Sequence, residues 1–523
     1  MAGTMGFICY FCRVITKVDL KSMASILSQK NKTAWAYIGC AVVVLLATAL
    51  RSLFAGKADI GNDECFSLYY AIGSFSDYAA ALSTNDNPPL WEFILHFWVK
   101  AFGISALSIR ILSVTFSSLA VVPIWLTGER FVGRHAGLVA SLLYSFSTFS
   151  IFLAHDGRVY SLLCLLSAWS LYLFLVAFND TEQKYGVWIG LTIVNVLIMY
   201  SHYMAFWVIV VEALVILIAP GALKRLWKPA LAHIAALVVC YLPMWPVLYC
   251  RLLDSGIHGT WISKSKSISA LYFMFCHLTN APVPAVLFLG LAFGALVVTL
   301  VNIIRKRYTW SNTTVLTLAW VVPLLVSFAV SFFLGMFLNR YFYFILPAYL
   351  LALTAYSRTL SGNKVWLRYT LDIAMILLMV VSCQPDSTKL RHAGWKGDVS
   401  ATAQRLLELE QETTCNIVIA PDWLDKQLVY YFDAAHSAFV CEGRFEEPVF
   451  EPYLTSRGYI YYSHLRLPDR PVVHIVRSAS YPVDEWISML EDNGYTLFST
   501  ENFLQQEIIT FKRTEIEHQP TEW

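Results

Sequence analysis

Two adjacent acidic residues, Asp63 and Glu64, follow the first long apolar run of the chain. They belong to residues 55–88, a stretch that is rich in acids for so apolar a protein. A carboxylate beside an apolar groove at a membrane–water boundary can serve as a general base, because partial desolvation raises its pKa. Any solvated loop outside a membrane also carries acids, so the spacing alone leaves both interpretations open.

Two arginines stand where they could bind a phosphate. Arg158 lies in the very short stretch His155–Tyr160 (HDGRVY), and Arg340 opens the aromatic stretch Asn339–Pro347 (NRYFYFILP). A guanidinium binds phosphate through its planar fork of donors. An arginine at the end of a membrane span can also serve only as an anchor that reaches the headgroups.

Further candidate residues lie at other predicted turns, helix starts and span ends. His202 lies at a turn between two apolar runs, where a lone histidine is commonly structural. Pro88 and Pro89 fix the backbone conformation where a helix begins. A plain turn followed by a helix would have the same two prolines without any functional role. The remaining candidates are His155, Asp156, Tyr160 and Tyr341.

The composition indicates that lipid is the solvent for most of the chain. Of 523 residues, 57% are hydrophobic and only 14% are charged, and the mean hydropathy is +0.56. Soluble domains carry roughly 25% charged residues. The formal net charge of +2 gives no reason to expect a nucleic-acid partner.

About eleven apolar runs are long enough to cross a bilayer, which takes ~20 residues. The first follows a short basic N-terminus, residues 1–32, and we expect it to be an uncleaved span. The expected spans are residues 33–54, 109–128, 136–154, 159–178, 186–201, 203–220, 229–249, 283–303, 314–336, 340–357 and 366–382.

The basic loops set the predicted orientation. With the N-terminus inside, alternate loops hold most of the Lys and Arg, as the positive-inside rule requires. These residues are Arg130, Arg134, Lys224, Arg225, Lys228, Arg305, Lys306, Arg307, Arg358, Lys364 and Arg368. Residues 88–103 are apolar but short, and counting them as a span would invert every later loop. We therefore expect an amphipathic helix at the outer interface, and all the candidate residues above then lie on the outer face.

After Ser382 the chain changes to soluble-domain character. We expect residues 383–523 to form an extracytoplasmic α/β domain, following a transmembrane domain of residues 33–382 whose first outer loop is 55–108. Short strands are expected at 416–420, 459–462, 472–476 and 507–512, with a helix at 482–493 that stops at Gly494. Cys415 and Cys441 could pair in an oxidising compartment.

An ordered set of short motifs resembles the GT-C glycosyltransferases, in the protein O-mannosyltransferase-like and aminoarabinose-transferase-like branch. The resemblance covers roughly residues 33–382. Its motifs are Asp63–Glu64, Pro88–Leu90 (PPL), Phe102–Gly103 followed by Arg110, Asp156–Ser161 (DGRVYS), and Arg340–Tyr341 with Pro347. Many relatives have His or Lys before the two prolines, where this chain has Asn87, so a role for that position in acceptor or metal binding does not carry over.

The resemblance implies a GT-C-like membrane fold and an inverting transfer of sugar from a polyprenyl-phosphate carrier outside the cytoplasm. Asp63 would be the base on the acceptor hydroxyl, with Glu64 the nearest competitor, and Arg158 and Arg340 would bind the donor phosphate. The acceptor could be a glycan, a lipid or a protein hydroxyl. The branch suggests the bacterial inner membrane.

Three points stay open from the sequence. No cofactor is established, and no metal-ligand spacing is present, although Asp63, Glu64 and His96 could approach a divalent metal. An oligosaccharide ligase or polymerase would share the membrane setting. A lipid or solute transporter would be expected to have charged residues near the bilayer midplane, whereas here the ionisable residues gather at one edge, which favours catalysis.

Overall fold

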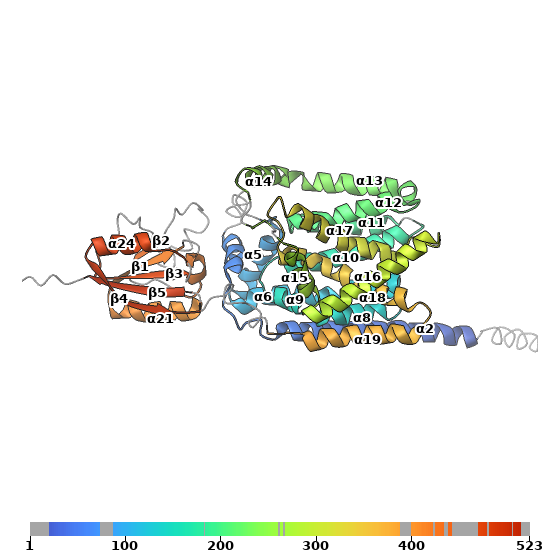
Figure 1. The fold of residues 1–523 in the computed structure, drawn as a ribbon, viewed down its shortest axis with the longest axis horizontal. Coiled ribbons are helices and arrows are strands. Elements are labelled where there is room, and N and C mark those ends of the chain that lie inside the picture. Colours follow the sequence, from blue (N-terminus) through green and yellow to red (C-terminus); the bar gives the residue numbers. More distant parts are fainter. Residues whose placement is uncertain are drawn as a thin grey trace, which may run out of the picture.

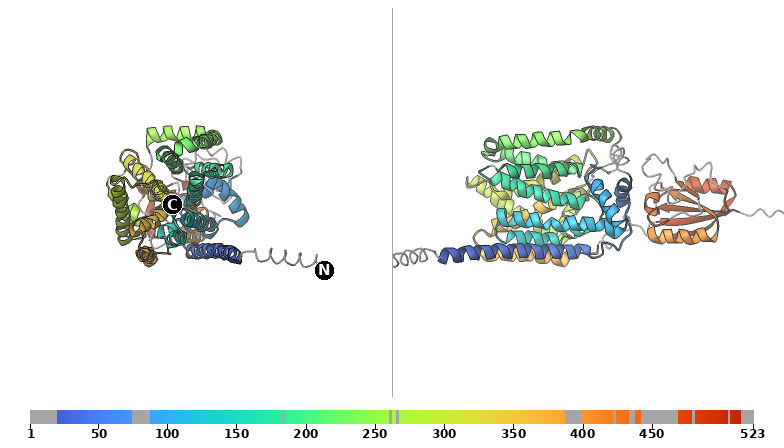
Figure 2. Two further views of the ribbon diagram at one scale, coloured as in Figure 1. Left: turned by 90° about the vertical axis from the view of Figure 1, so that its right-hand side faces the viewer. Right: turned by 180° about the vertical axis from the view of Figure 1, so that it is seen from behind.

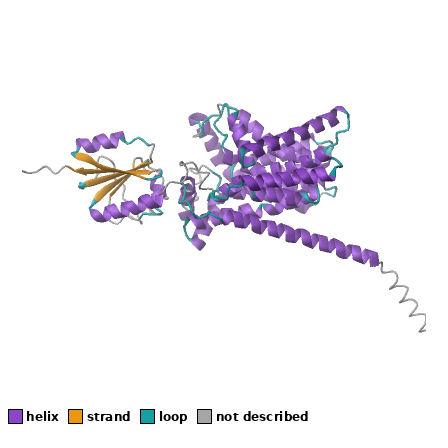
Figure 3. Cartoon of the chain, turned by 60° about the horizontal axis from the view of Figure 1, so that its bottom comes forward, coloured by secondary structure: helices purple, strands orange, loops and turns teal. Residues whose placement is uncertain are grey.

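The computed structural model describes residues 20–73, 87–182, 184–259, 262–264, 267–386, 399–421, 424–432, 438–441, 469–478, 481–504 and 506–513. Its first part is a bundle of helices, and its second part is a small sheet flanked by helices. Figure 1 shows the sheet domain at one end of the bundle, next to α5 (Leu90–Phe102). Figures 2 and 3 show α2 (Leu20–Ser52) running along the edge of the bundle and extending beyond its opposite end.

The bundle is built from helices of very different lengths, most of them apolar. Besides α2 and α5 they are α3 (Asn62–Ile72), α6 (Ala106–Leu119), α7 (Val121–Thr127), α8 (Ala136–Ser145), α9 (Thr148–Ala154), α10 (Tyr160–Asn179), α11 (Tyr185–Met199), α12 (Phe206–Ile218), α13 (Ala222–Tyr241), α14 (Trp245–His258), α15 (Ser269–Leu278), α16 (Pro282–Ile304), α17 (Asn312–Val330), α18 (Leu346–Ser361) and α19 (Val365–Ser382). Short turns of other helix types are η1 (Gly128–Val132), η2 (Tyr203–Ala205), η3 (Leu242–Met244) and η4 (Asn339–Ile345).

The polytopic helical fold expected from the sequence is confirmed. Within the described residues, 7 helices are long and apolar enough to cross a membrane, or up to 8 if the pair α8 and α9, bent by 58°, forms one span. Each expected run falls on a helix, but α11, α12 and α18 are shorter than a full span. The count of eleven crossings therefore stays a prediction. In the span expected at 340–357, residues 340–345 form the 3-10 helix η4, which leads directly into α18.

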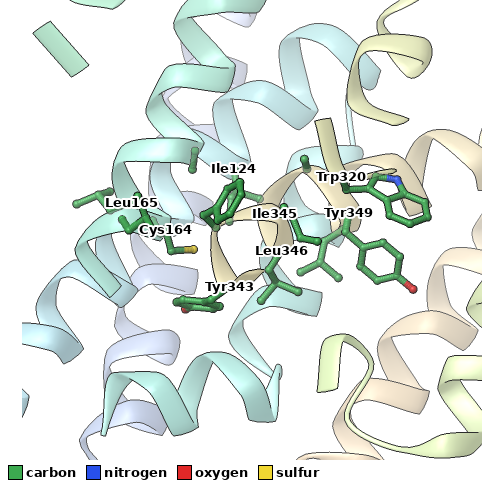
Figure 4. Packing of buried hydrophobic residues seen from close by; sticks show 14 of the residues in the cluster. Ile124, Cys164, Leu165, Trp320, Tyr343, Ile345, Leu346 and Tyr349 are labelled. Carbon is green, nitrogen blue, oxygen red and sulfur yellow. The ribbon is translucent and has the colours of Figure 1, made fainter. Parts of the chain in front are cut away.

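Helix α18 forms the centre of the bundle. Its side chains from Leu346 to Ser357 are buried on every face, as expected for a helix that is apolar all round. Figure 4 shows Leu346 and Tyr349 packed with Trp320 and with Cys164 of α10. Burial of this helix fixes η4, and with it Arg340, at one end of the bundle.

The first outer loop is held by a buried ion pair between Glu64 of α3 and Arg110 of α6. Glu64 is fully buried and Arg110 is 1% exposed. The guanidinium donates Nε to Oε1 at 2.8 Å and Nη2 to Oε2 at 2.7 Å. It also donates to the carbonyl oxygens of Ala55, Ala58 and Asp59. One arginine thus joins α3, α6 and the connecting loop.

The C-terminal domain contains a five-stranded mixed sheet in the order β2-β1-β3-β5-β4. Strands β1 (Cys415–Ala420), β2 (Ala438–Cys441) and β3 (Val472–Ser478) are parallel, whereas β5 (Gln506–Arg513) and β4 (Tyr495–Asn502) continue the sheet antiparallel. Alternate strand residues pack against α21 (Val399–Glu412) on one face and α24 (Asp484–Asp492) on the other.

The expected α/β character of this domain is confirmed, with gaps. The strands expected at 416–420, 472–476 and 507–512 are β1, β3 and β5, and the helix at 482–493 is α24, which ends before Gly494 at φ +81°. The sequence analysis missed α21, β2, β4 and the short α22 (Asp425–Leu428). The strand expected at 459–462 lies outside the described residues.

The pairing of Cys415 with Cys441, which the sequence leaves open, does not occur. Cys415 is a free, buried cysteine. In the parallel register Cys441 pairs with Ile419, four residues along β1 from Cys415. Four strand residues span about 13 Å, which is too far for a disulfide, whose Cα atoms lie within about 7 Å.

The C-terminal domain packs directly against α3. Tyr69 and Tyr70, at the far end of α3, belong to the hydrophobic cluster under α21 and β1. The Tyr431 hydroxyl accepts a bond from the Ile60 amide at 2.7 Å, and Lys426 lies 4.9 Å from the centre of the Tyr69 ring. The domain therefore covers the outer loop that carries the acidic pair.

We expect replacement of Arg110 by Met to destabilise the protein strongly, because it leaves the buried Glu64 carboxylate without its cation. Removing one partner of a buried pair costs about 3–5 kcal/mol. The measurement is the thermal unfolding midpoint of the purified protein in detergent. The matched control is Arg405→Met, which breaks a pair with Glu501 in which Arg405 is 30% exposed and should cost less than about 1 kcal/mol. Equal midpoints for the two variants would contradict the anchoring role.

A second prediction concerns His474 of β3. Its side chain is 2% exposed, and its Nδ1 lies 2.9 Å from the Thr510 hydroxyl. Burial lowers the pKa of His474 to about 4; Glu501 opposes this effect, while Arg405 and Lys512 add to it.

Because the folded pKa lies below the ordinary value of 6.5, the unfolded domain binds a proton between these two values that the folded domain does not. The free energy of unfolding should therefore fall as the pH drops from about 6.5 to about 4, by at most about 1.4 kcal/mol per pH unit. Hydrogen–deuterium exchange of β3 peptides, corrected for the intrinsic exchange rate, measures this slope. The slope should shrink in His474→Gln; an unchanged slope would assign it to other groups.

Candidate functional site

Asp63 is the accessible member of the acidic pair. It lies in the first turn of α3, and its side chain is 38% exposed. Its Oδ2 accepts a bond from Nη1 of Arg340 at 2.5 Å, although the two residues are 277 positions apart. The structure therefore brings together two residues that the sequence analysis assigned to different steps of the chemistry.

Glu64 has a different environment from its neighbour. Besides the bonds from Arg110, its Oε2 accepts from the Gly61 amide at 2.6 Å and its Oε1 accepts from the Gly157 amide at 2.8 Å. The first of these contacts closes the N-terminus of α3, and the second holds the short loop before α10. Gly157 has little room for a side chain, since an added Cβ would lie 3.3 Å from Oε1 of Glu64. The Glu64 carboxylate is therefore used in positioning other elements.

Arg158, like Arg340, contacts Asp63. Its Nη1 donates to the Asp63 carbonyl at 2.9 Å and to the Ser67 hydroxyl at 2.6 Å. Its Nε is buried and has no hydrogen-bond partner among the described residues. Two guanidinium groups thus converge on Asp63, one on its backbone and one on its carboxylate, and form a cationic site beside an accessible acid.

An aromatic cluster surrounds these cations. The Arg340 guanidinium carbon lies 5.9 Å from the centre of the Tyr160 ring. His202 packs edge-on against Tyr341 at 4.8 Å and lies 6.0 Å from Tyr160. These four residues come from α10, η4 and the turn before η2, so three distant segments meet at one end of the bundle.

His202 is oriented by the backbone. Its Nδ1 accepts a bond from the Met204 amide at 3.1 Å, so the proton of the neutral ring is on Nε2. That atom is buried without a partner in the described part of the chain. Burial, together with the positive charges of Arg158 and Arg340, lowers the pKa of His202 to about 3. His202 is therefore a neutral hydrogen-bond donor next to two cations.

The two prolines position α5 beside this cluster. Helix α5 begins at Leu90, directly after Pro88 and Pro89, and the Leu90 amide donates to the Tyr200 carbonyl at 2.9 Å. The helix is too short to span a membrane and packs against α3, which agrees with the expected interfacial helix. The prolines thus join the entrance of α5 to the turn that carries His202.

His155 and Asp156 lie behind the site. His155 is 1% exposed, with Nε2 placed 2.7 Å from the carbonyl oxygen of Arg51. Asp156 is 6% exposed, and its carbonyl accepts a bond from the Ser113 hydroxyl. Both residues hold the loop that carries Arg158.

Two residues of the site were missed by the sequence analysis. Glu92 of α5 is 1% exposed, and its Oε1 accepts a bond from the Ser67 hydroxyl at 3.0 Å. Ser67 in turn accepts from Arg158, so a chain of contacts runs from α5 to the cationic site. The sequence did hold a signal, because Glu92 is the one acid on a mostly apolar helix. The serine gave no signal at all.

One expectation about charge placement was wrong. Not all ionisable residues gather at the edge: Glu212 of α12 is buried inside the bundle and accepts bonds from Ser170 and Asn195. His233 contacts the same Asn195. Both carboxylate oxygens are bonded, so this cluster joins α10, α11, α12 and α13 as an interhelical polar contact.

In the described part of the chain, no group of three or more His, Cys, Asp and Glu side chains is arranged to hold a metal ion. His96, which could have joined the acidic pair, instead places Nδ1 2.7 Å from the Ala71 carbonyl, and Glu64 is bound by Arg110. A divalent metal in the reaction stays an untested prediction.

Part of the chain matches a known protein family by sequence. The model of the dolichyl-phosphate-mannose-protein mannosyltransferase family matches residues 86–250, a stretch that includes Pro88, Arg158 and His202. No curated protein in the comparison matches the chain by sequence.

Among solved structures, ArnT from Cupriavidus metallidurans in the apo state is 13% identical at a TM-score of 0.56, over 91% of this chain and 98% of ArnT. The structure of the same protein bound to undecaprenyl phosphate gives the same identity, coverage and TM-score. The archaeal oligosaccharyltransferase AglB from Archaeoglobus fulgidus, solved with an inhibitory peptide and a dolichol-phosphate, is 12% identical over 86% of this chain and 70% of AglB, at a TM-score of 0.47. The expected architecture is thereby confirmed: the chain is an integral membrane protein of the GT-C fold.

Proposed function

We propose that this protein is a glycosyltransferase that moves a sugar from a polyprenyl-phosphate carrier to a hydroxyl acceptor, with inversion, on the extracytoplasmic face. The observation that carries the proposal is the contact of an accessible carboxylate, Asp63, with two arginines, Arg158 and Arg340, at the end of the bundle that bears the C-terminal domain. The GT-C fold and the similarity to a structure that holds undecaprenyl phosphate support it.

The donor phosphate fits the two arginines. Arg340 is 7% exposed and Arg158 has a buried Nε available for a further bond. A phosphate between them would share the Arg340 guanidinium with Asp63, and it would gain charge-assisted hydrogen bonds in a largely desolvated site. The fixed cations then stabilise the charge that grows on the phosphate as it leaves.

Asp63 fits the base better than Glu64 does. The acceptor oxygen attacks the anomeric carbon, the bond from that carbon to the phosphate oxygen breaks, and the acceptor proton passes to a carboxylate. The phosphate leaves with the bonding electrons and needs no acid. Glu64 has both oxygens occupied by Arg110 and by backbone amides, whereas Asp63 is accessible and would share Arg340 with the donor phosphate.

His202 completes the donor site as a neutral group. Its Nε2–H is directed away from the Met204 contact, in the aromatic cluster with Tyr160 and Tyr341. A neutral donor can bond a phosphate or sugar oxygen without competing with Asp63 for a proton. Tyr160 and Tyr341 provide apolar surface beside the cations.

The remaining parts of the proposal concern the setting. The acceptor is a glycan, lipid or protein hydroxyl, and the C-terminal domain, which covers the outer loop, lies where an acceptor would approach. We place the protein in the bacterial inner membrane, with residues 1–32 in the cytoplasm and 383–523 outside. An oligosaccharide ligase or polymerase and a lipid or solute transporter are the alternatives that the assay below separates.

In a membrane supplied with radiolabelled polyprenyl-phosphate sugars, we expect the wild-type protein to transfer label and Asp63→Asn to lose about 10²–10⁴-fold in rate, the usual contribution of a general base. Arg340→Ala should lose activity too, because it removes a donor contact to the leaving phosphate. The measurement is label in the acceptor fraction against time.

The matched control is Asp59→Asn, which changes another acid of the same loop whose side chain instead contacts the Ser400 amide. Its rate should stay close to wild type. Full activity of Asp63→Asn would move the base elsewhere. Label appearing in long glycan chains would favour the polymerase, and movement of lipid without transfer would favour the transporter. Repeating the assay with a chelator tests the divalent metal.

The pH dependence gives an independent test of His202. Since burial, together with Arg158 and Arg340, lowers its pKa to about 3, the ring keeps its neutral form as the pH falls from 8 to 5. The wild-type rate should therefore show no inflection near the ordinary histidine value of about 6.5. His202→Ala should lower the rate by about tenfold through loss of one hydrogen bond to a charged group without changing the shape of the profile. An inflection near pH 6.5 in the wild-type profile that is absent from the His202→Ala profile would show that His202 titrates in this range.

A further inference from the structure

A large cavity opens at the other end of the bundle, and it shares no residue with the candidate site. Its volume is about 820 Å³. It is lined by the ends of η1, α10 and α12, the starts of α13 and α17, and the end of α18. These segments include loops that the positive-inside rule predicts to be cytoplasmic.

Two arginines line this cavity. Arg225 of α13 donates to the Phe178 carbonyl, and Arg358 of α18 donates to the Val132 carbonyl. Arg358 lies so close to Gly133, which has a φ of +145°, that a Cβ there would fall 1.9 Å from Nη1. Neither arginine has an acidic partner within ion-pair distance in the described structure, and Nε of Arg358 is buried without a hydrogen-bond partner there.

Two helix N-termini add to the positive potential. Helix α13 starts at Ala222 after Gly221, and α17 starts at Asn312 after Ser311; all four residues line the cavity. Neither helix has an acidic residue in its first turn or a side-chain bond at its N-cap. The unsatisfied amides of such a terminus carry a partial positive charge, equivalent to roughly half an elementary charge.

No acidic side chain lines the cavity; Asp372 of α19, which interacts electrostatically with Arg358, is not among the lining residues. The lining residues include a further hydrogen-bond donor, Trp310, whose Nε1 is buried without a partner in the described part of the chain. A surface arginine placed only to set membrane orientation would extend into the headgroups. Here two arginines, two helix N-termini and an indole donor surround one cavity, which is the arrangement of an anion site.

We propose that this cavity binds a phosphate group, presented by an anionic lipid of the adjacent leaflet. Two phosphate oxygens can each meet a guanidinium, and a third can meet the amides at the start of α17. The volume far exceeds that of a phosphate ion, and the lining also contains Phe131, Val132 and Phe178, which suit the glycerol and upper acyl part of a lipid. Basic pockets between membrane helices on the cytoplasmic side commonly bind lipid headgroups. The site does not depend on the transferase proposal.

The test is native mass spectrometry of the protein released from nanodiscs made of equal amounts of phosphatidylglycerol and phosphatidylcholine. Wild type should retain phosphatidylglycerol preferentially. The double variant Arg225→Gln with Arg358→Gln should reduce that preference by about tenfold or more, because each lost contact is a hydrogen bond to a charged group. The matched control, Lys306→Gln with Arg307→Gln, removes two charges from a nearby loop outside the cavity and should leave the preference unchanged.

A second variant, Asn312→Asp, addresses folding. A carboxylate in the first turn of α17 stabilises the helix, yet it repels a phosphate, so a lost preference in a well-folded variant still supports the site. Titration of inorganic phosphate into protein in phosphatidylcholine nanodiscs distinguishes the sources: phosphate binding without a lipid preference would keep the anion site and assign it to a soluble phosphate. Equal retention of both lipids by wild type without phosphate binding, or an unchanged preference in both test variants, would overturn the proposal.

Discussion

The buried pair of Glu64 and Arg110 is the contact on which the outer end of the molecule depends. Through it a single carboxylate caps α3, holds the loop of Gly157 and neutralises an arginine that gathers the carbonyls of the first outer loop. Two charges removed from water are tolerated only because nearly all their donors and acceptors are satisfied. Asp63 precedes Glu64 in the chain and Arg158 follows Gly157, so the contacts of Glu64 position both.

This arrangement places two adjacent acids in different environments. A helix of 3.6 residues per turn directs consecutive side chains about 100° apart, so Glu64 enters the protein while Asp63 faces Arg340. Glu64 holds neighbouring segments in place, whereas Asp63 stays accessible beside Arg340. The sequence showed the acidic pair, but it could not show which acid does which, because the decision comes from Arg110 and Gly157, which approach from other segments.

The sequence predicted most of what depends on local composition. Apolar runs located the helices, basic loops grouped at the end that carries the cavity around Arg225, and β-branched stretches located β1, β3 and β5. The sequence did not predict features that depend on contacts between distant segments. These are the ion pair of Asp63 with Arg340, 277 positions apart, and the buried Glu212 cluster. It also missed β4, most of whose residues are exposed. Cys415 and Cys441 are a further example, because the register of β1 and β2, which keeps the two cysteines apart, could not be read from the sequence.

The position of α3 has a mechanical consequence. This helix of 11 residues, about 16 Å long, has Asp63 at one end in the bundle and Tyr69 and Tyr70 at the other end in the core of the C-terminal domain. Glu64, held by Arg110, lies one residue from Asp63, the proposed base. If the C-terminal domain tilts relative to the bundle, α3 rotates about its held end near Asp63. Tyr69 and Tyr70 then move most, while the Asp63 carboxylate mainly changes its orientation. A ligand that tilts the domain would thereby turn the Asp63 carboxylate without moving it away from Arg340.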